Sequence, residues 1–487
     1  MIEPIGIFTV ALGLYCLTRG YGATVTTFIV LTLLGSAAAL TLGGSSVPPA
    51  HLFLLFVLIA ALRTPSLPGM AINAFRLGKP AFWLAGLLLY GAISAYFSPR
   101  LFAGMSHIIP LGASEYPSTG GTVPLGPVSS NLTQTIYLTA DLLCFVIIAS
   151  VCSTKTGFRA TFNGLLAWAA VNVMFALLDL ATSATGTEEL LQFMRNAQYT
   201  FHDSDTVNGM KRIVGSWPEA SAFAGMTLGA LGFTGTLWIC GRYPGTTGLL
   251  ALCSFVLIIL STSSTGLIAA PICLFLLYLT AVLRCGISPE SRRSTGVVLL
   301  APPIALALTL IIVLQDNLFR TIYDYVDLLV LSKSTSGSAV ERGSWNLAAW
   351  QNFTDSLGLG VGLGTARTSS FPMALLSNVG VPGTVFFLLF LLSALRPGMS
   401  ARTFESDVRL AACNGCLGLL AGSLVAGPTV DLGLLFFVLA GLTASRPLAR
   451  LKEIPLLPLR GSGVLDSAAE ARHSHPQLSL HSRKHQT

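Results

Sequence analysis

Long apolar segments recur along the whole of this chain, and they restrict its fold more than any other feature. A helix that crosses a membrane needs about 20 mostly apolar residues. Only 10% of the 487 residues are charged, whereas about a quarter are charged in a typical soluble domain. We therefore predict an all-α polytopic membrane protein with about 13 (12–14) spans, near residues 5–18, 24–42, 49–63, 79–97, 134–152, 160–183, 217–240, 246–261, 265–284, 296–314, 371–394, 409–427 and 430–446.

These spans are expected to form one polytopic membrane domain over residues 1–446. Two places leave alternatives, because 246–284 can be one span or two and 49–63 is short enough to be tilted or partly re-entrant. The segment 447–487 is basic and then rich in Ser and His, so we expect a disordered tail. Three long polar loops interrupt the domain, at 98–133, 184–216 and 315–370.

Lysine and arginine are distributed unevenly between the two sides of the predicted domain. One set of connections, which includes the short turns and the tail, holds 20 of the 28 residues, and the set that includes the three long loops holds 8. Cytoplasmic loops of membrane proteins carry the excess of positive charge. We therefore predict a cytoplasmic tail, an outside N-terminus and extracytoplasmic long loops. The net charge of +7 is then mainly an orientation signal, and no nucleic acid partner is expected.

Ionisable side chains are scarce within the predicted spans. No Lys or Arg lies in mid-span, and the acids there are Asp141, Asp179, Glu219 and Asp431. A proton-coupled transporter usually carries ionisable groups along its path through the membrane. Here they gather in the long loops and at span ends, which favours a site at the outer membrane face. The simpler interpretation of Asp141 and Asp179 is one helix–helix hydrogen bond each.

The third long loop is predicted to contain two helices. Residues 317–331 have the apolar spacing of a helix that lies on a membrane surface. Ser338-Ala-Val-Glu341 is a capping box, so a second helix should begin at Ser338 and run to about residue 356. Arg342 falls near the start of that helix, and Trp345 follows one turn later.

A Gly-x-Gly-x-Gly-x-Gly ladder, Gly358–Gly364, follows this second helix. Glycine lacks a side chain, so the backbone here can approach another surface closely. A dinucleotide-binding loop would need a preceding strand and a soluble βαβ unit, and the sequence has neither. The simpler interpretation is a glycine-rich return to the membrane, with Arg342 and Arg367 meeting lipid headgroups.

The second long loop ends in Lys211-Arg-Ile-Val-Gly-Ser-Trp-Pro-Glu219. Pro218 suits the first turn of the next span, and Trp217 suits the membrane interface. Glu219 should then lie in that first turn, near the positive end of the helix dipole. This helix start, with Arg212 before it, can hold an anion. The alternative is that Glu219 only complements the dipole.

These two segments, in this order on the outer side of a polytopic chain, resemble the O-antigen polymerase and O-antigen ligase superfamily. The pattern Arg212-x-x-Gly-x-Trp-Pro-Glu-x-Ser is similar to the polymerase form of the first signature. Arg342-x-x-Trp345, with fifteen residues between Arg342 and Gly358, is similar to the second. SPRLFAG at 98–104 and the apolar stretch 375–391 are also similar to segments of these polymerases. The specific motifs cover a small part of the chain.

Two positions depart from the family patterns. Ligases carry a histidine eleven residues before the glycine that matches Gly380, and this chain has Ser369 there. The ligase interpretation thereby loses its candidate base, which favours a polymerase. The first arginine motif of the polymerases usually has ten residues before its glycine, whereas twelve separate Arg212 from Gly225.

The resemblance implies a GT-C-like fold with two large helical extracytoplasmic loops in a bacterial inner (plasma) membrane. It also implies a glycosyltransferase that joins polyprenyl-diphosphate-linked repeat units into O-antigen or exopolysaccharide. The donor is a glycan on a polyprenyl diphosphate, and the acceptor is a sugar hydroxyl of another lipid-linked unit. A chain-length regulator and a flippase of the same pathway are expected partners, besides the lipid bilayer. The alternatives are a ligase with another acceptor and a transporter of lipid-linked glycans.

Such a reaction requires the protein to hold the diphosphate and to offset the charge that develops on it. Arginine suits this task because it stays charged and offers a planar fork to phosphate oxygens. No carboxylate pair has metal-ligand spacing, so we expect a reaction without metal or other cofactor. We predict that Arg212 and Arg342 are catalytic together with Glu219, the base for the acceptor hydroxyl. The other possible bases are Asp324, Asp327, Glu341 and His202. The predicted substrate-binding residues are Lys211, Arg320, Trp345, Gly360, Gly362 and Arg367.

Overall fold

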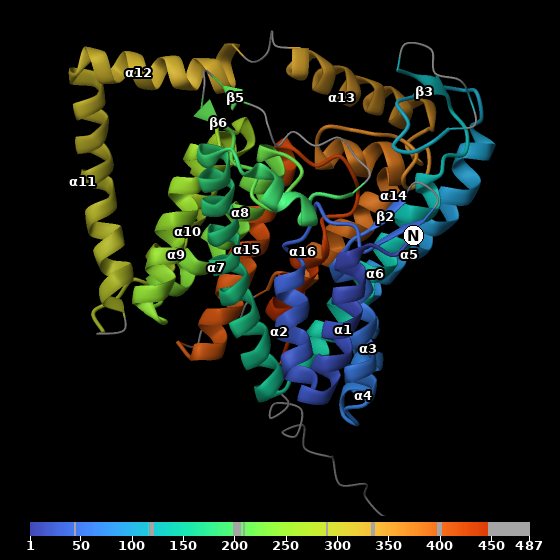
Figure 1. The fold of residues 1–487 in the computed structure, drawn as a ribbon, viewed down its shortest axis with the longest axis horizontal. Coiled ribbons are helices and arrows are strands. Elements are labelled where there is room, and N and C mark those ends of the chain that lie inside the picture. Colours follow the sequence, from blue (N-terminus) through green and yellow to red (C-terminus); the bar gives the residue numbers. More distant parts are fainter. Residues whose placement is uncertain are drawn as a thin grey trace, which may run out of the picture. The chain divides into compact units, whose positions relative to one another are not determined.

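The computed structural model describes residues 1–42, 45–114, 116, 121–197, 206–207, 210–288, 291–332, 337–396 and 402–446. The chain divides into two compact units, Met1–Leu448 and Ala449–Thr487, and every described residue belongs to the first. The predicted disordered tail, 447–487, lies outside the described residues. The protein is 74% helical and all-α, with three short two-stranded hairpins (Figure 1).

The helices are α1 (Pro4–Arg19), α2 (Tyr21–Leu31), α3 (Pro49–Leu62), α4 (Leu67–Ala74), α5 (Pro80–Leu101), α6 (Ser130–Val151), α7 (Lys155–Thr185), the 3-10 helix η1 (Glu188–Met194), α8 (Ala220–Ile239), α9 (Pro244–Leu260), α10 (Ser264–Arg284), α11 (Arg292–Leu314), α12 (Asp316–Val326), the π-helix η3 (Asp327–Leu331), α13 (Gly337–Asp355), α14 (Phe371–Ala394), α15 (Phe404–Val425) and α16 (Leu434–Ala444). The antiparallel strand pairs are β1 (Leu40–Leu42) with β2 (Ser45–Val47), β3 (His107–Ile108) with β4 (Val123–Pro124), and β5 (Thr206–Val207) with β6 (Met210–Lys211).

Many of these helices are long and apolar enough to cross a membrane. Within the described ranges there are eight, namely α5, α6, α7, α8, α10, α11, α14 and α15. A ninth span results if α3 and α4, which are bent by 113° at their junction, count as one. The shorter apolar helices are α1, α2, α9 and α16. The prediction of an all-α, multi-pass membrane protein is therefore confirmed, and the number of 13 spans stays a prediction.

Three predicted boundaries can be compared with the helices. The segment 246–284 forms two helices, α9 and α10, as one of the two alternatives required. The expected span at 24–42 is wrong, because α2 ends at Leu31 and the chain then turns into β1. The turn is held from outside: the amide of Ser36 donates to the carbonyl of Ser216 over 3.3 Å. The span predicted from residue 409 begins earlier, at Phe404.

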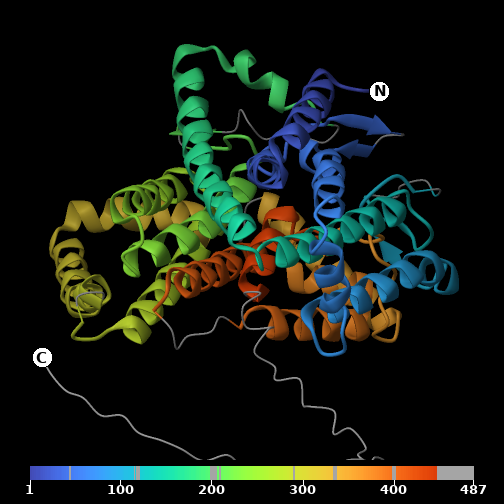
Figure 2. The same cartoon turned by 90° about the horizontal axis from the view of Figure 1, so that it is seen from below.

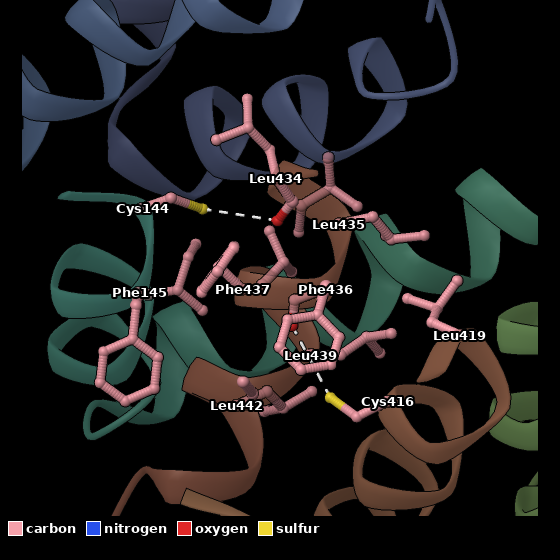
Figure 3. Packing of buried hydrophobic residues seen from close by; sticks show 14 of the residues in the cluster. Cys144, Phe145, Cys416, Leu419, Leu434, Leu435, Phe436, Phe437, Leu439 and Leu442 are labelled. Carbon is pink, nitrogen blue, oxygen red and sulfur yellow. Dashed lines mark hydrogen bonds between the residues drawn. The ribbon is translucent and has the colours of Figure 1, made fainter. Parts of the chain in front are cut away.

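A short helix with apolar residues on every side occupies the core. Every residue of α16 from Leu434 to Thr443 is buried, which is expected for a helix that other helices surround. Figure 3 shows its packing against α6 and α15, where the thiols of Cys144 and Cys416 lie 3.7 Å from the carbonyl oxygens of Leu434 and Phe436. In Figure 2 the red ribbon of α16 lies among the other helices.

The long loops gather at one end of the helices, which we call the loop end and define by β3, β5, β6, α12 and α13 (Figure 1). The described residues 241–243, 285–288 and 402–403 lie next to the opposite ends of their helices, which we call the basic end. The helix predicted at 317–331 is confirmed as α12 and η3, and its position on a membrane surface stays a prediction. It is fixed to the ends of α9 and α10, because Tyr325 donates to the carbonyl of Ile259 over 2.7 Å and Ser264 donates to that of Leu329 over 2.6 Å.

Candidate functional site

The loop that leads into α8 is held rigidly by a buried ion pair. Asp179, near the end of α7, pairs with Arg195 over 2.8 Å, and both side chains are almost fully buried. The other carboxylate oxygen of Asp179 accepts the amides of Val214 and Gly215, at 2.8 and 3.0 Å. A carboxylate that satisfies a cation and two amides fixes the path of this loop. The predicted helix–helix hydrogen bond of Asp179 is therefore replaced by a contact between a helix and a loop.

Glu219 is the last residue of this loop and not part of the first turn of the helix. It lies at the N-cap of α8 with extended backbone, and its carbonyl accepts the amide of Phe223 over 3.1 Å. The prediction that Pro218 begins the helix is thus wrong. The physical reason is that residues before it are tied down elsewhere: Ser216 donates to the carbonyl of Leu33 over 2.8 Å, and the Trp217 indole donates to Asn172 over 3.3 Å.

The second predicted helix of the third loop is confirmed as α13, and its buried face is anchored by two asparagines. Asn352, which is buried, accepts a hydrogen bond from Ser106 over 3.0 Å. Asn346 accepts the amide of Ser369 over 3.0 Å. The first contact joins α13 to the loop after α5, and the second joins it to the segment before α14. Both fix the rotation of α13 and hence the direction of Arg342 and Trp345.

The glycine ladder forms a tight, internally bonded loop. All four of its glycines, Gly358, Gly360, Gly362 and Gly364, have positive φ between 75° and 110°, a region that side chains other than glycine rarely adopt. The loop is tied to α6 by Ser130, which donates to the carbonyl of Gly364 over 2.7 Å. It is tied to α14 by the Gly362 amide, which donates to the carbonyl of Asn378 over 3.0 Å.

This packing changes the role predicted for Gly360 and Gly362. Both are buried, and the Gly360 amide is used by the protein itself, since it donates to Ser356 over 3.0 Å. The backbone of the glycine ladder packs closely against α14 at Gly380, where α14 is interrupted by a non-helical residue. The two glycines therefore shape and support the loop, and their predicted contact with substrate stays a prediction.

We expect Gly360→Ala to lower the free energy of unfolding. A Cβ there would lie 2.6 Å from the amide nitrogen of Gly380 and 2.7 Å from the carbonyl oxygen of Asn378. The φ of +84° adds a backbone penalty, so the loss should be about 1–3 kcal/mol or more. Thermal unfolding of the purified protein measures it. The matched control is Gly69→Ala in α4, where a Cβ meets nothing within 4 Å. Equal melting temperatures of the two variants would contradict this role of Gly360.

Glu219 and Arg342 meet at the loop end, although 122 residues separate them in sequence. A guanidinium nitrogen of Arg342 lies 3.6 Å from a carboxylate oxygen of Glu219, with 31% and 36% of the two side chains exposed. The other carboxylate oxygen of Glu219 accepts a hydrogen bond from Ser221. At 3.6 Å the pair attracts electrostatically without a hydrogen bond. Within the described part of the chain, the Arg342 guanidinium makes this ion pair and no hydrogen bond.

Arg367 and Trp345 form the other half of this arrangement. The Arg367 guanidinium lies over the indole ring, 4.4 Å from the ring centroid, which is a cation–π contact. Trp345 follows Arg342 by three residues on α13, so the two side chains share one face of the helix. The structure therefore brings Glu219, Arg342, Trp345 and Arg367 together. We call these four residues the Glu219–Arg342 site.

Lys211, Arg212 and Arg320 come from β6, from the residue after it and from α12. Arg212 follows β6, seven residues before Glu219, and Lys211 pairs with Glu188 over 3.5 Å. A hydrogen bond from Ser183 is the main cause that lowers the pKa of Glu188, and the charge of Lys211 adds to it. Arg320 is exposed on α12 and makes no hydrogen bond or ion pair with the described residues, and its predicted contact with substrate stays a prediction.

Among the alternative bases, Asp324 and Glu341 are exposed. Asp327 is half-buried at the start of η3, and His202 lies outside the described residues.

Several residues that build the site were not identified from sequence. Asn378 binds both backbone polar groups of Ala366, in the segment before α14: its side-chain amide accepts from the Ala366 nitrogen and donates to the Ala366 oxygen, each over 3.0 Å. Asn131 donates to the carbonyl of Leu363 over 2.8 Å. Asparagines inside apolar segments are the signal that could have identified them, because a buried amide needs partners.

No group of three or more His, Cys, Asp or Glu side chains in the described ranges has the geometry to hold a metal ion. Comparison of the chain with protein-family models gives no match. Comparison with curated proteins gives none either.

Proposed function

We propose that this protein is a polysaccharide polymerase that joins polyprenyl-diphosphate-linked repeat units at the outer face of a bacterial inner membrane. One observation carries the proposal. The two sequence segments that resemble polymerase signatures are far apart in the chain, and a direct ion pair between Glu219 and Arg342 brings them together. An acid and an arginine at one solvent-accessible place are the groups that glycosyl transfer from a lipid diphosphate requires.

The proposed reaction forms one glycosidic bond and breaks one bond to phosphate. The acceptor hydroxyl oxygen attacks the anomeric carbon of the donor glycan, and its proton passes to the Glu219 carboxylate. The bond between that carbon and the diphosphate oxygen breaks, and its electron pair leaves with the polyprenyl diphosphate. The Arg342 and Arg367 guanidinium groups offset the charge on the leaving diphosphate.

The ion pair suggests how donor binding and acceptor activation are coupled. The Arg342 guanidinium faces Glu219 from 3.6 Å when no substrate is present. A diphosphate offers more negative charge and better hydrogen-bond geometry than this contact, so it should draw the guanidinium away from Glu219. Glu219 would then be available to the acceptor hydroxyl. The stack of Arg367 on Trp345 holds the second cation in a fixed direction.

Purified protein, reconstituted with a lipid-linked repeat unit, tests the proposal. A ladder of products that differ by one repeat unit is expected from a polymerase. A single transfer to a different acceptor would instead identify a ligase, and translocation of the unit without any longer product would identify a transporter. Either of these results would overturn the polymerase assignment.

The proposal also requires the loop end to lie outside the cytoplasm. Reporter fusions after Thr206 and after Ser334 should therefore read as extracytoplasmic, and a fusion after Ser467 should read as cytoplasmic, in line with the Lys and Arg distribution. A reporter active in the cytoplasm at Ser334 would remove the outer-face location of the Glu219–Arg342 site.

A further inference from the structure

A cavity rich in arginine lies at the basic end, away from the Glu219–Arg342 site. Its volume is about 320 Å³, and Arg242, Arg284, Arg293, Arg402 and Asp407 line it. These residues come from the turn after α8, from the last residue of α10, from the first turn of α11 and from the start of α15. Glu219 precedes the first residue of α8 and the cavity adjoins its last, so the length of this 20-residue helix separates the two sites by about 30 Å.

One carboxylate serves two of the four arginines. Asp407 is 3% exposed, and its oxygens lie 2.8 Å from the Arg242 guanidinium and 3.0 Å from that of Arg284. Arg284 is itself 6% exposed. Arg242, Arg284 and Asp407 brace the C-terminal ends of α8 and α10 against α15, and together they carry a net positive charge.

The other two arginines have no acidic partner within the described residues. Arg402 donates to the hydroxyls of Ser288 and Ser291 and to the carbonyl of Cys285, which are neutral acceptors. Arg293 reaches the turn after α8. A Cβ built on Gly241 would lie 3.2 Å from one of its guanidinium nitrogens. The lining side chains therefore carry four positive charges and one negative charge around a space that can admit a ligand.

We propose that this cavity binds a phosphate group, and that its source is the headgroup of an anionic phospholipid in the cytoplasmic leaflet. Arginine forks match phosphate oxygens in pairs of hydrogen bonds. Basic pockets between membrane helices on the cytoplasmic side are suited to such headgroups. The Lys and Arg distribution assigns the basic end to the cytoplasmic side.

The surroundings of the cavity favour a lipid over a free anion. Arg293 belongs to the first turn of α11, and the most apolar stretch of α11 has no side chain buried by the described protein. In Figure 1 this helix stands apart from the others along most of its length. A lipid whose phosphate lies in the cavity can place its acyl chains along this apolar surface, whereas inorganic phosphate gains nothing from it.

Lipid binding by the purified full-length chain tests this proposal. Dioleoyl phosphatidylglycerol, added to protein in a neutral detergent, should raise the melting temperature and bind in native mass spectra, and dioleoyl phosphatidylcholine should do neither. Arg293→Gln and Arg402→Gln should each lower the phosphatidylglycerol affinity about 10-fold or more, because each removes charge-assisted hydrogen bonds. The matched control is Arg292→Gln, which removes the exposed neighbouring arginine that does not line the cavity.

Three other results would overturn the proposal. Equal losses in Arg292→Gln and Arg293→Gln would show general surface attraction and overturn the site. Inorganic phosphate that stabilises the protein as strongly as phosphatidylglycerol would overturn the lipid source. Unchanged affinity in Arg293→Gln, with a normal melting temperature, would overturn the proposal even if Arg402→Gln fails to fold. None of these outcomes depends on the proposed polymerase activity.

Discussion

Arg342→Lys is expected to lower the rate of glycan elongation by about 100-fold while the protein accumulates normally in the membrane. Lysine keeps the positive charge but loses the planar fork that binds two phosphate oxygens at once. Each charge-assisted hydrogen bond that is lost costs about 1.5–3 kcal/mol, which corresponds to at least a tenfold change in rate. The arginine is half-exposed and makes no hydrogen bond with the described part of the chain, so its replacement should not unfold the protein.

The control for this variant is the same substitution at Arg100, on the same predicted side of the membrane. The Arg100 guanidinium lies over the Tyr96 ring, 4.1 Å from its centroid, and donates to the Tyr96 carbonyl. Arg100→Lys should therefore change elongation little. Full activity of Arg342→Lys would reduce Arg342 to a cation at the lipid headgroups and would remove the diphosphate role.

Glu219→Gln should abolish elongation and leave donor binding intact. The amide has the shape of the carboxylate but cannot take the proton of the acceptor hydroxyl, and loss of a general base typically costs about 100- to 10,000-fold in rate. The substitution also removes the charge that faces Arg342 from 3.6 Å. The variant should thus bind the lipid-linked donor at least as tightly as the original protein does. Donor affinity and elongation are measured on the same preparation.

Two results would contradict a base at Glu219. If elongation in Glu219→Gln stays near normal, the residue only complements the dipole of α8, a contribution of about 0.3–1 kcal/mol. If donor binding and elongation fall together, Glu219 positions Arg342 and does not act as the base. Glu189→Gln is the matched control, because Glu189 is exposed on η1 and its side chain makes no hydrogen bond or ion pair with the described residues.

The helices of this protein could be predicted well from sequence because their apolar composition dominates. Hydropathy does not distinguish a membrane span from a buried turn, however. The segment after Leu31 is as apolar as a span, yet the chain turns there. Gly35 leaves room for the Trp217 ring, because a Cβ at residue 35 would lie only 2.6 Å from a carbon of that ring. Such a contact between distant segments leaves no trace in a local window.

The start of α15 differs from the prediction. The span expected from residue 409 leaves Asp407 in the connection before it. In the structure Asp407 is inside the helix and buried, because Arg242 and Arg284 neutralise it from two other helix ends. Partners that come from distant connections cannot be identified in a single sequence.

The candidate site shows the same division between local and distant information. The capping box predicted α13 to within one residue of its start, because helix start signals are local. The ion pair between Glu219 and Arg342 depends on how α13 is rotated over α8. Hydrogen bonds of Asn346 and Asn352 to residues far along the chain fix that rotation. The glycines were predicted to let the backbone approach another surface closely, and in the structure Gly360 approaches the backbone of α14.

The count of polyprenyl diphosphate released against glycosidic bonds formed tests the central claim most directly. Purified protein is given one lipid-linked repeat unit, and both products are measured over time, with Glu219→Gln as the inactive reference. The account predicts one diphosphate released for each new bond, with every product chain still carrying one lipid diphosphate. Bonds without release, release without bonds, or equal rates in Glu219→Gln would contradict polymerisation at the Glu219–Arg342 site.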